Sequence, residues 1–93
     1  MRSKGHILWA DDEIEMLKPH ILYLENKGYE VTPVKTGEDA THICDEQNID
    51  LVLLDEMMTG LDGLTTLKNI KDKHSTLPVI MITKNEEEWL MEE

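Results

Sequence analysis

Short apolar runs alternate along the chain with longer segments in which apolar residues recur every three or four positions. The short runs are typical of strands and the longer segments of amphipathic helices. Strands are predicted over His6–Ala10, Tyr29–Val34, Asp50–Asp55 and Pro78–Thr83. Helices are predicted after each strand, beginning near Ile14, Thr36, Asp62 and Asn85.

The strands differ in polarity, and this difference predicts their places in a sheet. Asp50–Asp55 contains four consecutive apolar residues, as a central parallel strand does. Tyr29–Val34 contains Pro33, which has no amide hydrogen to donate, so this strand is expected at an edge. Because strands joined by helices pair in parallel with right-handed crossovers, the pattern predicts an α/β fold with a doubly wound parallel sheet.

The helix ends carry recognisable signals. In the first helix, Pro19 is expected to kink the helix or delay its regular part, and Gly28 to stop it. Thr36 and Asp62 are predicted to cap the second and third helices. The inward residues are expected to be Ala40, Ile43 and Cys44 in the second helix and Leu64, Leu67 and Ile70 in the third.

Composition narrows the class of protein. The chain has 93 residues, enough for one small domain, and 40% of them are hydrophobic. Nine basic and twenty acidic residues give a net charge of −11, which argues against nucleic-acid binding through phosphate contacts. The apolar runs are too short to span a membrane, and the single cysteine, Cys44, suits a reducing compartment, so we expect a cytoplasmic protein.

Acidic residues lie at the ends of two of the predicted strands. Asp11 and Asp12 come after the first strand and Asp55 closes the third, while Thr83 closes the fourth. Parallel strands bring these ends to one edge of the sheet, where each carboxylate pair at about 5 Å and an effective dielectric constant near 20 repels by about 3 kcal/mol. Hard oxygen ligands in such an open site suit Mg²⁺. An aspartate beside a metal ion can also act as a nucleophile toward phosphorus.

Three segments in this order resemble the response-regulator receiver domain of two-component systems: Ile7–Glu13, Leu53–Gly63 and Val79–Lys84. The resemblance covers essentially the whole chain and implies the doubly wound fold of the CheY and flavodoxin type. It implies a regulatory switch rather than an enzyme, apart from self-catalysed phosphorylation and dephosphorylation. The implied partner is a sensor histidine kinase.

The resemblance also implies a role for each residue at the strand ends. Asp55 is the expected phosphoacceptor and Thr83 the switch hydroxyl. For Mg²⁺, the expected ligands are Asp12, Asp55 and the backbone carbonyl of Met57, with Asp11 acting through a bound water. The four histidines, His6, His20, His42 and His74, share no ligand spacing and are not expected to bind metal.

The chain departs from the family pattern at its end. Receivers carry a lysine after a fifth strand and then a fifth helix, and this chain ends before both. We therefore expect residues 1–93 to be an incomplete receiver domain, truncated after the fourth strand–helix unit, with a C-terminal effector domain outside this chain. Weakened phosphorylation is expected without the lysine. The fourth strand is expected to form an exposed edge that favours dimers or strand exchange.

A narrower resemblance concerns Lys18–His20, Tyr29–Val34 and Ile82–Glu88, which are similar to the receiver of PorX-type regulators. In those regulators the receiver precedes a PglZ-type effector domain.

Two other functions stay open at this point. A phosphorylation-independent interaction module could use the same fold; the intact acidic cluster argues against it, and the missing lysine partly for it. A Mg²⁺-dependent phosphatase of the haloacid dehalogenase type also uses an aspartyl nucleophile. It needs an Asp-x-Asp pair after the first strand, however, whereas Asp11 and Asp12 are adjacent.

Overall fold

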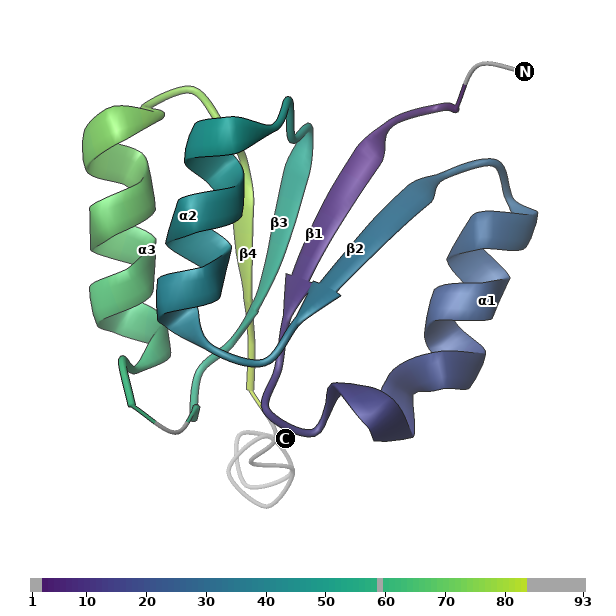
Figure 1. The fold of residues 1–93 in the computed structure, drawn as a ribbon, viewed down its shortest axis with the longest axis horizontal. Helices are drawn as coiled ribbons and strands as arrows, with labels where there is room; N and C mark the ends of the chain where they lie inside the picture. The colour runs from purple at the N-terminus through teal and green to yellow at the C-terminus, as the bar shows by residue number, and fades with distance from the viewer. Residues whose placement is uncertain (1–2, 59, 84–93) are drawn as a thin grey trace, which may run out of the picture.

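The computed structural model describes residues 3–58 and 60–83, which form a four-stranded parallel sheet with helices on both faces (Figure 1). The strands are β1 (His6–Ala10), β2 (Glu30–Val34), β3 (Leu51–Asp55) and β4 (Val79–Ile82). A short 3-10 helix, η1 (Ile14–Leu17), leads into α1 (Lys18–Asn26), and the other helices are α2 (Gly37–Glu46) and α3 (Gly63–Lys73). The predicted doubly wound α/β fold is confirmed.

The strand order is β2-β1-β3-β4, so β3 is central and β2 lies at an edge, as predicted. Pro33 is tolerated there because an edge strand does not need every amide for the ladder. β2 begins one residue later than expected, and β4 is one residue shorter at each end. β4 forms the other edge of the described sheet.

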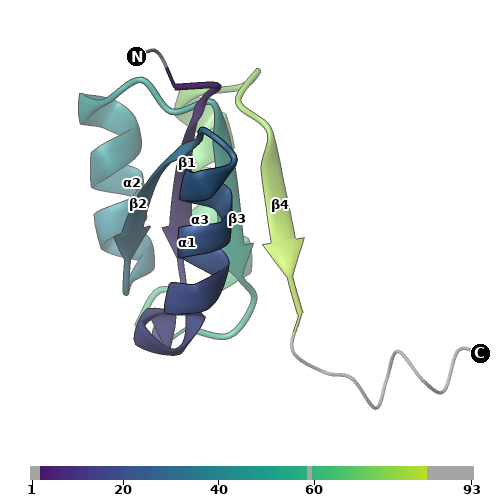
Figure 2. The same ribbon diagram turned by 90° about the vertical axis from the view of Figure 1, so that its right-hand side faces the viewer.

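The sheet separates two apolar clusters. Figures 1 and 2 show α2 and α3 on one face of the sheet and α1 on the other. Leu8, Val52 and Leu54 are fully buried against α2 and α3, whereas Ile7 and Trp9 are buried toward α1. This alternation follows from the period of two along a strand, and burial on both faces is what makes the runs continuously apolar.

The four predicted helix signals act as expected, including Asp62, whose side chain caps α3. Pro19 lies in the first turn of α1, and the preceding residues form the 3-10 turn, so the regular helix is delayed. Gly28 ends the segment with a φ of +103°, which favours glycine. Thr36 caps α2, where its Oγ1 accepts a hydrogen bond from the Asp39 amide at 3.1 Å.

One prediction for the third helix, the inward position of Leu64, is wrong. Leu67 is partly buried and Ile70 fully buried, as expected, but Leu64 is 67% exposed. The inward positions in the first two turns are Gly63 and Thr66, both buried. Leu64 lies about 100° further around the helix than Gly63 and so faces solvent.

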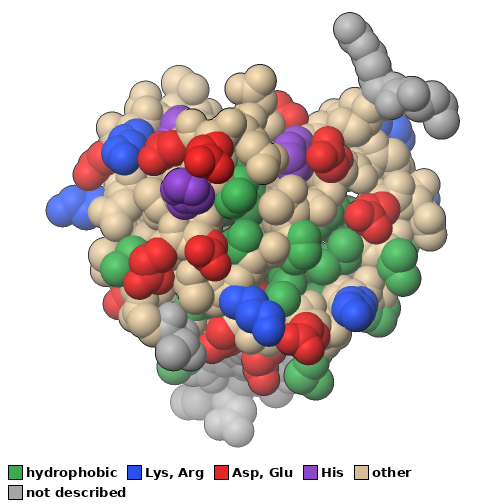
Figure 3. Space-filling view, viewed as in Figure 1, with side chains coloured by type: hydrophobic (Ala, Val, Ile, Leu, Met, Phe, Trp, Pro, Cys, Tyr) green, Lys and Arg blue, Asp and Glu red, His purple; other side chains and the backbone are tan. Residues whose placement is uncertain are grey.

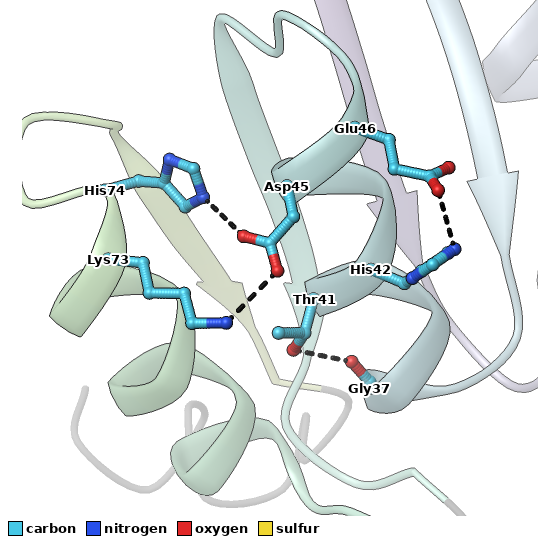
Figure 4. A network of polar contacts seen from close by, with 7 residues as sticks. All are labelled: Gly37, Thr41, His42, Asp45, Glu46, Lys73 and His74. Atoms are coloured by element: carbon cyan, nitrogen blue, oxygen red, sulfur yellow. Dashed lines mark hydrogen bonds and ion pairs between the residues drawn. The ribbon is translucent and has the colours of Figure 1, made fainter.

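Polar contacts join α2 to the C-terminal end of α3 (Figure 4). Asp45 Oδ1 lies 2.9 Å from His74 Nε2, and Asp45 Oδ2 accepts a hydrogen bond from Lys73 Nζ at 3.2 Å. The hydrogen bond from His74 and, to a lesser extent, that from Lys73 lower the pKa of Asp45. This network lies at the end of α3 opposite to its first turn, and so apart from the strand ends that carry Asp11 and Asp55.

Cys44 is buried in α2, as predicted, and the burial raises the pKa of its thiol to about 11. None of the described helices is long and apolar enough to cross a membrane. The helix predicted from Asn85 lies outside the described residues.

Candidate functional site

Three carboxylates converge where β1 and β3 end. Asp11, Asp12 and Asp55 each offer an oxygen, and these oxygens all lie within 4.8 Å of one another. The register explains the convergence, because Ala10 pairs with Leu54 and the acids follow these two residues directly. Within residues 3–58 and 60–83 this is the one cluster of three side chains suited to hold a metal ion.

Backbone amides fix the orientation of two of these carboxylates. The Glu13 amide donates to Asp11 Oδ1 at 2.8 Å, and the Met57 amide donates to Asp55 Oδ1 at 3.2 Å. Asp11 and Asp55 are each only 1% exposed, whereas Asp12 is half-buried. Two carboxylates are therefore held in place by their own loops, and the third lies closer to solvent.

The loops themselves are tied to neighbouring strands. The Asp11 amide donates to the Val34 carbonyl at 3.0 Å, and the Glu56 amide donates to the Ile82 carbonyl at 3.0 Å. These bonds extend the ladder one residue beyond the paired strands. The strand ends are thus held as one edge, and this edge fixes where the carboxylates project.

The electrostatics of this cluster favour a cation. Negative charges about 5 Å apart repel by about 3 kcal/mol per pair at an effective dielectric constant near 20. Oxygen donors alone, with no nitrogen or sulfur ligand in the cluster, are the set that a hard divalent cation prefers. Asp12 is the most exposed of the three carboxylates. The donor set therefore fits Mg²⁺.

Met57 follows Asp55 closely in the chain, and Thr83 lies just past the end of the neighbouring strand β4. Met57 lies in the bend after β3, and it is 75% exposed while its amide donates a hydrogen bond to Asp55 Oδ1. Thr83 follows Ile82, the residue of β4 that pairs with Asp55. The structure thus brings all five predicted site residues to one edge of the sheet, and their roles in phosphorylation and metal binding stay predictions.

The histidines take part in other contacts. His6 Nε2 lies 2.6 Å from Thr32 Oγ1, and His20 packs edge-on against the ring of Trp9. His42 lies 3.1 Å from Glu46 one turn along α2, and His74 contacts Asp45. Each of the four therefore has a local structural role in the described part of the chain.

Two features of the site were not predicted from the sequence. One is the Glu13 amide that holds Asp11, and the other is the close approach of Gly63 to the backbone after β3. Glu13 follows two acids at a strand end, where an aspartate commonly accepts a bond from the amide two residues on, so that signal was available. The approach of Gly63 depends on how α3 packs, and no local pattern reports it.

Comparison with known proteins identifies the family. The family model described as "Response regulator receiver domain" matches residues 7–93. The regulatory protein VanR of Enterococcus faecium is 43% identical over 82 residues, which are 88% of this chain and 35% of that protein. The chain therefore spans about a third of the length of such curated relatives.

Solved structures agree with this assignment. The response regulator TrrA of Thermotoga maritima, in complex with Mg²⁺ and BeF, has a TM-score of 0.79 and 33% identity. That match covers 85% of this chain and 69% of the other. The CheX–CheY–BeF3–Mg²⁺ complex of Borrelia burgdorferi has a TM-score of 0.81 and 29% identity, covering 97% and 69% of the two chains.

The fold, the acidic strand ends and these matches agree, and the chain belongs to the response regulator receiver domain family of two-component systems.

Proposed function

We propose that Asp55 is the phosphoacceptor of this receiver and that Mg²⁺ binds between Asp11, Asp12 and Asp55. The observation that carries the proposal is the convergence of three carboxylate oxygens within 4.8 Å at the carboxyl edge of the parallel sheet. Ligands in a doubly wound sheet bind beyond this edge. When bound, Mg²⁺ supplies positive charge that offsets the negative charge of the carboxylates and of an incoming phosphoryl group.

The proposed donor is a phosphohistidine of a sensor histidine kinase. An Asp55 oxygen attacks phosphorus, the phosphorus–nitrogen bond breaks, and the histidine ring leaves and takes up a proton. The amide of Met57 fixes the other Asp55 oxygen and so orients the nucleophile. The product is an acyl phosphate on Asp55, and hydrolysis by water would return the carboxylate.

Each neighbouring residue has a proposed part in this site. Asp12 and Asp55 are direct ligands, as is the Met57 carbonyl, and Asp11 acts through a bound water. Asp11 is well constrained, since it is buried and its Oδ1 accepts a hydrogen bond from the Glu13 amide. Thr83 is the proposed switch hydroxyl, supported by its place directly after the residue that pairs with Asp55.

The proposed output is control of an effector domain that follows the receiver. Support comes from the curated relatives, which include regulatory proteins about three times the length of this match. A cytoplasmic location is proposed, in line with a sensor kinase as the phosphoryl donor. The likeness to the receiver of PorX-type regulators stays a prediction.

Charge bears on the choice of partner. Acidic side chains are spread over the face seen in Figure 3 rather than gathered in one patch. With a net charge of −11, the domain favours partners that present basic residues, and it does not favour a phosphate backbone. We therefore propose protein partners for this domain and no direct contact with nucleic acid.

The test is the intact mass of the chain after incubation with acetyl phosphate, with and without Mg²⁺. One added phosphoryl group is expected for the wild type with Mg²⁺, and none for Asp55→Asn. Asp62→Asn is the matched control, because Asp62 is an exposed aspartate near the site that caps α3, and asparagine caps equally well. Equal modification of Asp55→Asn and wild type would overturn the proposal.

A further inference from the structure

Gly63 stands closer to the end of β3 than any side chain could. It is the first residue of α3, is buried, and donates its amide to the Glu56 carbonyl at 3.2 Å. A Cβ at this position would lie 2.6 Å from the Asp55 carbonyl oxygen and 2.8 Å from Glu56 Cα. Contacts under 3.0 Å essentially never occur for real Cβ atoms, so the backbone after β3 would have to move.

The third atom that a Cβ at Gly63 would approach too closely belongs to β4. The same Cβ would lie 2.9 Å from Met81 Sδ, two residues before Thr83. Gly63 therefore lies between the strand end that carries Asp55 and the strand that leads to Thr83. Its φ is not positive, so the need for glycine here concerns space and not backbone conformation.

The position matters because Asp55 has little freedom to absorb a shift. It is 1% exposed, its carboxylate accepts the Met57 amide, and its oxygen lies within 4.8 Å of those of Asp11 and Asp12. A displacement of the Asp55 carbonyl and Glu56 would tilt the carboxylate away from its two partners. It would also move the Met57 amide that orients it.

The other glycines do not share this property. Gly37 also packs tightly, but the obstructing atoms belong to Thr66 and Leu61, so it controls the spacing of α2 and α3. Gly60 has a φ of +83°, and a Cβ there would meet only the Glu38 carboxylate, at 3.5 Å or more. Among the described glycines, Gly63 alone faces the backbone of Asp55.

We propose that Gly63 is a positioning residue of the phosphoacceptor site. Because Gly63 has no side chain, the first turn of α3 can pack directly against the backbone of Asp55. This close packing holds the three carboxylates in their metal-binding arrangement. This proposal rests on the proposed function of Asp55 and deepens it. Gly63 acts through the backbone of Asp55 and Glu56 and touches no ligand itself.

The test compares Gly63→Ala with Ile70→Ala, a fully buried residue two turns along the same helix. Both substitutions destabilise the fold, but only the first disturbs the backbone of Asp55. The readout is the Mg²⁺ dissociation constant from Trp9 fluorescence, in a Trp89→Phe background so that a single tryptophan reports. At a temperature where both variants are folded, we expect Gly63→Ala to weaken Mg²⁺ binding at least tenfold and Ile70→Ala to change it less than twofold.

A double variant locates the obstruction. Met81→Ala removes the sulfur contact but leaves the two backbone contacts, so Gly63→Ala with Met81→Ala should bind Mg²⁺ as weakly as Gly63→Ala alone. Full recovery in the double variant would overturn the proposal, because the obstruction would then be Met81. Unchanged Mg²⁺ binding in Gly63→Ala would also overturn it.

Two controls separate this inference from other failures. If Gly63→Ala is unfolded in buffer, both single variants are compared in trimethylamine oxide, which favours the compact state. Wild type that binds no Mg²⁺ and accepts no phosphoryl group would refute the proposed function itself. Wild type that does both, beside a Gly63→Ala variant that does both equally well, would refute the positioning role alone.

Discussion

The carboxylate of Asp12 differs from its two neighbours in its exposure. It is half-buried, while Asp11 and Asp55 are buried and held by backbone amides. A residue with this exposure can be replaced with little effect on packing, which makes Asp12 the best probe of metal binding. Its contribution to a bound cation can thus be measured apart from its contribution to the fold.

Asp12→Asn is expected to weaken Mg²⁺ binding at least tenfold, because one of the three negative charges around the ion is lost. At a Mg²⁺ concentration a hundred times the wild-type dissociation constant, binding stabilises the wild type by about 2.7 kcal/mol and the variant by at most about 1.4 kcal/mol. Urea unfolding with Mg²⁺ and with a chelator measures both values. Glu25→Gln, an exposed charge change on α1, is the control and should keep the full gain.

The buried thiol of Cys44 should make the stability of the fold depend on pH in the alkaline range. Its pKa is raised to about 11 by burial, while the unfolded thiol keeps its ordinary value near 9. The stability that the neutral thiol contributes is therefore present below pH 9 and is lost as the pH rises through 11. Stability should fall over this range in the wild type, and this part of the fall should be absent in Cys44→Ala.

Alkylation of Cys44 gives an independent check. The native thiol should react with iodoacetamide far more slowly than the thiol in urea, because it is 5% exposed and protonated at neutral pH. Equal rates in the two conditions would contradict the buried placement of Cys44.

At the scale of elements, α2 and α3 begin with different kinds of cap. Thr36 accepts the Asp39 amide through a neutral hydroxyl, and Asp62 accepts the Thr65 amide at 2.8 Å through a carboxylate. The hydrogen bond from the Thr65 amide lowers the pKa of Asp62. One cap should therefore be indifferent to acid, and the other should weaken when its carboxylate is protonated.

The two caps are distinguished by their dependence on pH. Thr36→Ala should lower the free energy of unfolding by about 1 kcal/mol at every pH. Asp62→Ala should be destabilising above pH 3.8, and its effect should shrink as the pH falls through the lowered pKa of the native carboxyl. Urea unfolding between pH 2 and 7 measures both. An effect of Asp62→Ala that is constant over this range would contradict the assigned cap.

The strands and caps could be predicted from the sequence because their signals are local. The apolar run in β3, Pro33 in β2 and Thr36 before α2 each determine a nearby structure. The meeting of Asp11, Asp12 and Asp55 also followed, since parallel strands share one carboxyl edge. The exposure of Leu64 did not follow, because it depends on how closely Gly63 packs against β3.

At the scale of the whole molecule, the described residues cover the two faces of the sheet unequally. Among the described elements, α2 and α3 pack on one face and α1 packs on the other (Figures 1 and 2). Beside α1, an open apolar groove is lined by Trp9, Leu24 and Leu53, among others. At the edge of the described sheet, Ile80 of β4 is 51% exposed. Exposed apolar strand edges favour pairing with another chain.

We expect the protein to associate at high concentration and Ile80→Lys to reduce this association, because a charged edge residue opposes strand pairing. Leu64→Lys is the control, since Leu64 is also exposed but lies on α3. Light scattering over a range of concentrations measures the mass of each variant. A wild type that stays monomeric throughout, or an Ile80→Lys variant that associates as strongly as the wild type, would contradict this expectation.

The most direct test of the account is to identify the phosphorylated residue. After incubation with acetyl phosphate and Mg²⁺, borohydride reduces an aspartyl phosphate to homoserine, and peptide mass spectrometry locates it. We predict homoserine at position 55 and at neither 11 nor 12, with none when Mg²⁺ is removed by a chelator. Homoserine at position 11 or 12, or equal labelling at position 55 without a divalent cation, would contradict the assignment of Asp55 as a metal-dependent phosphoacceptor.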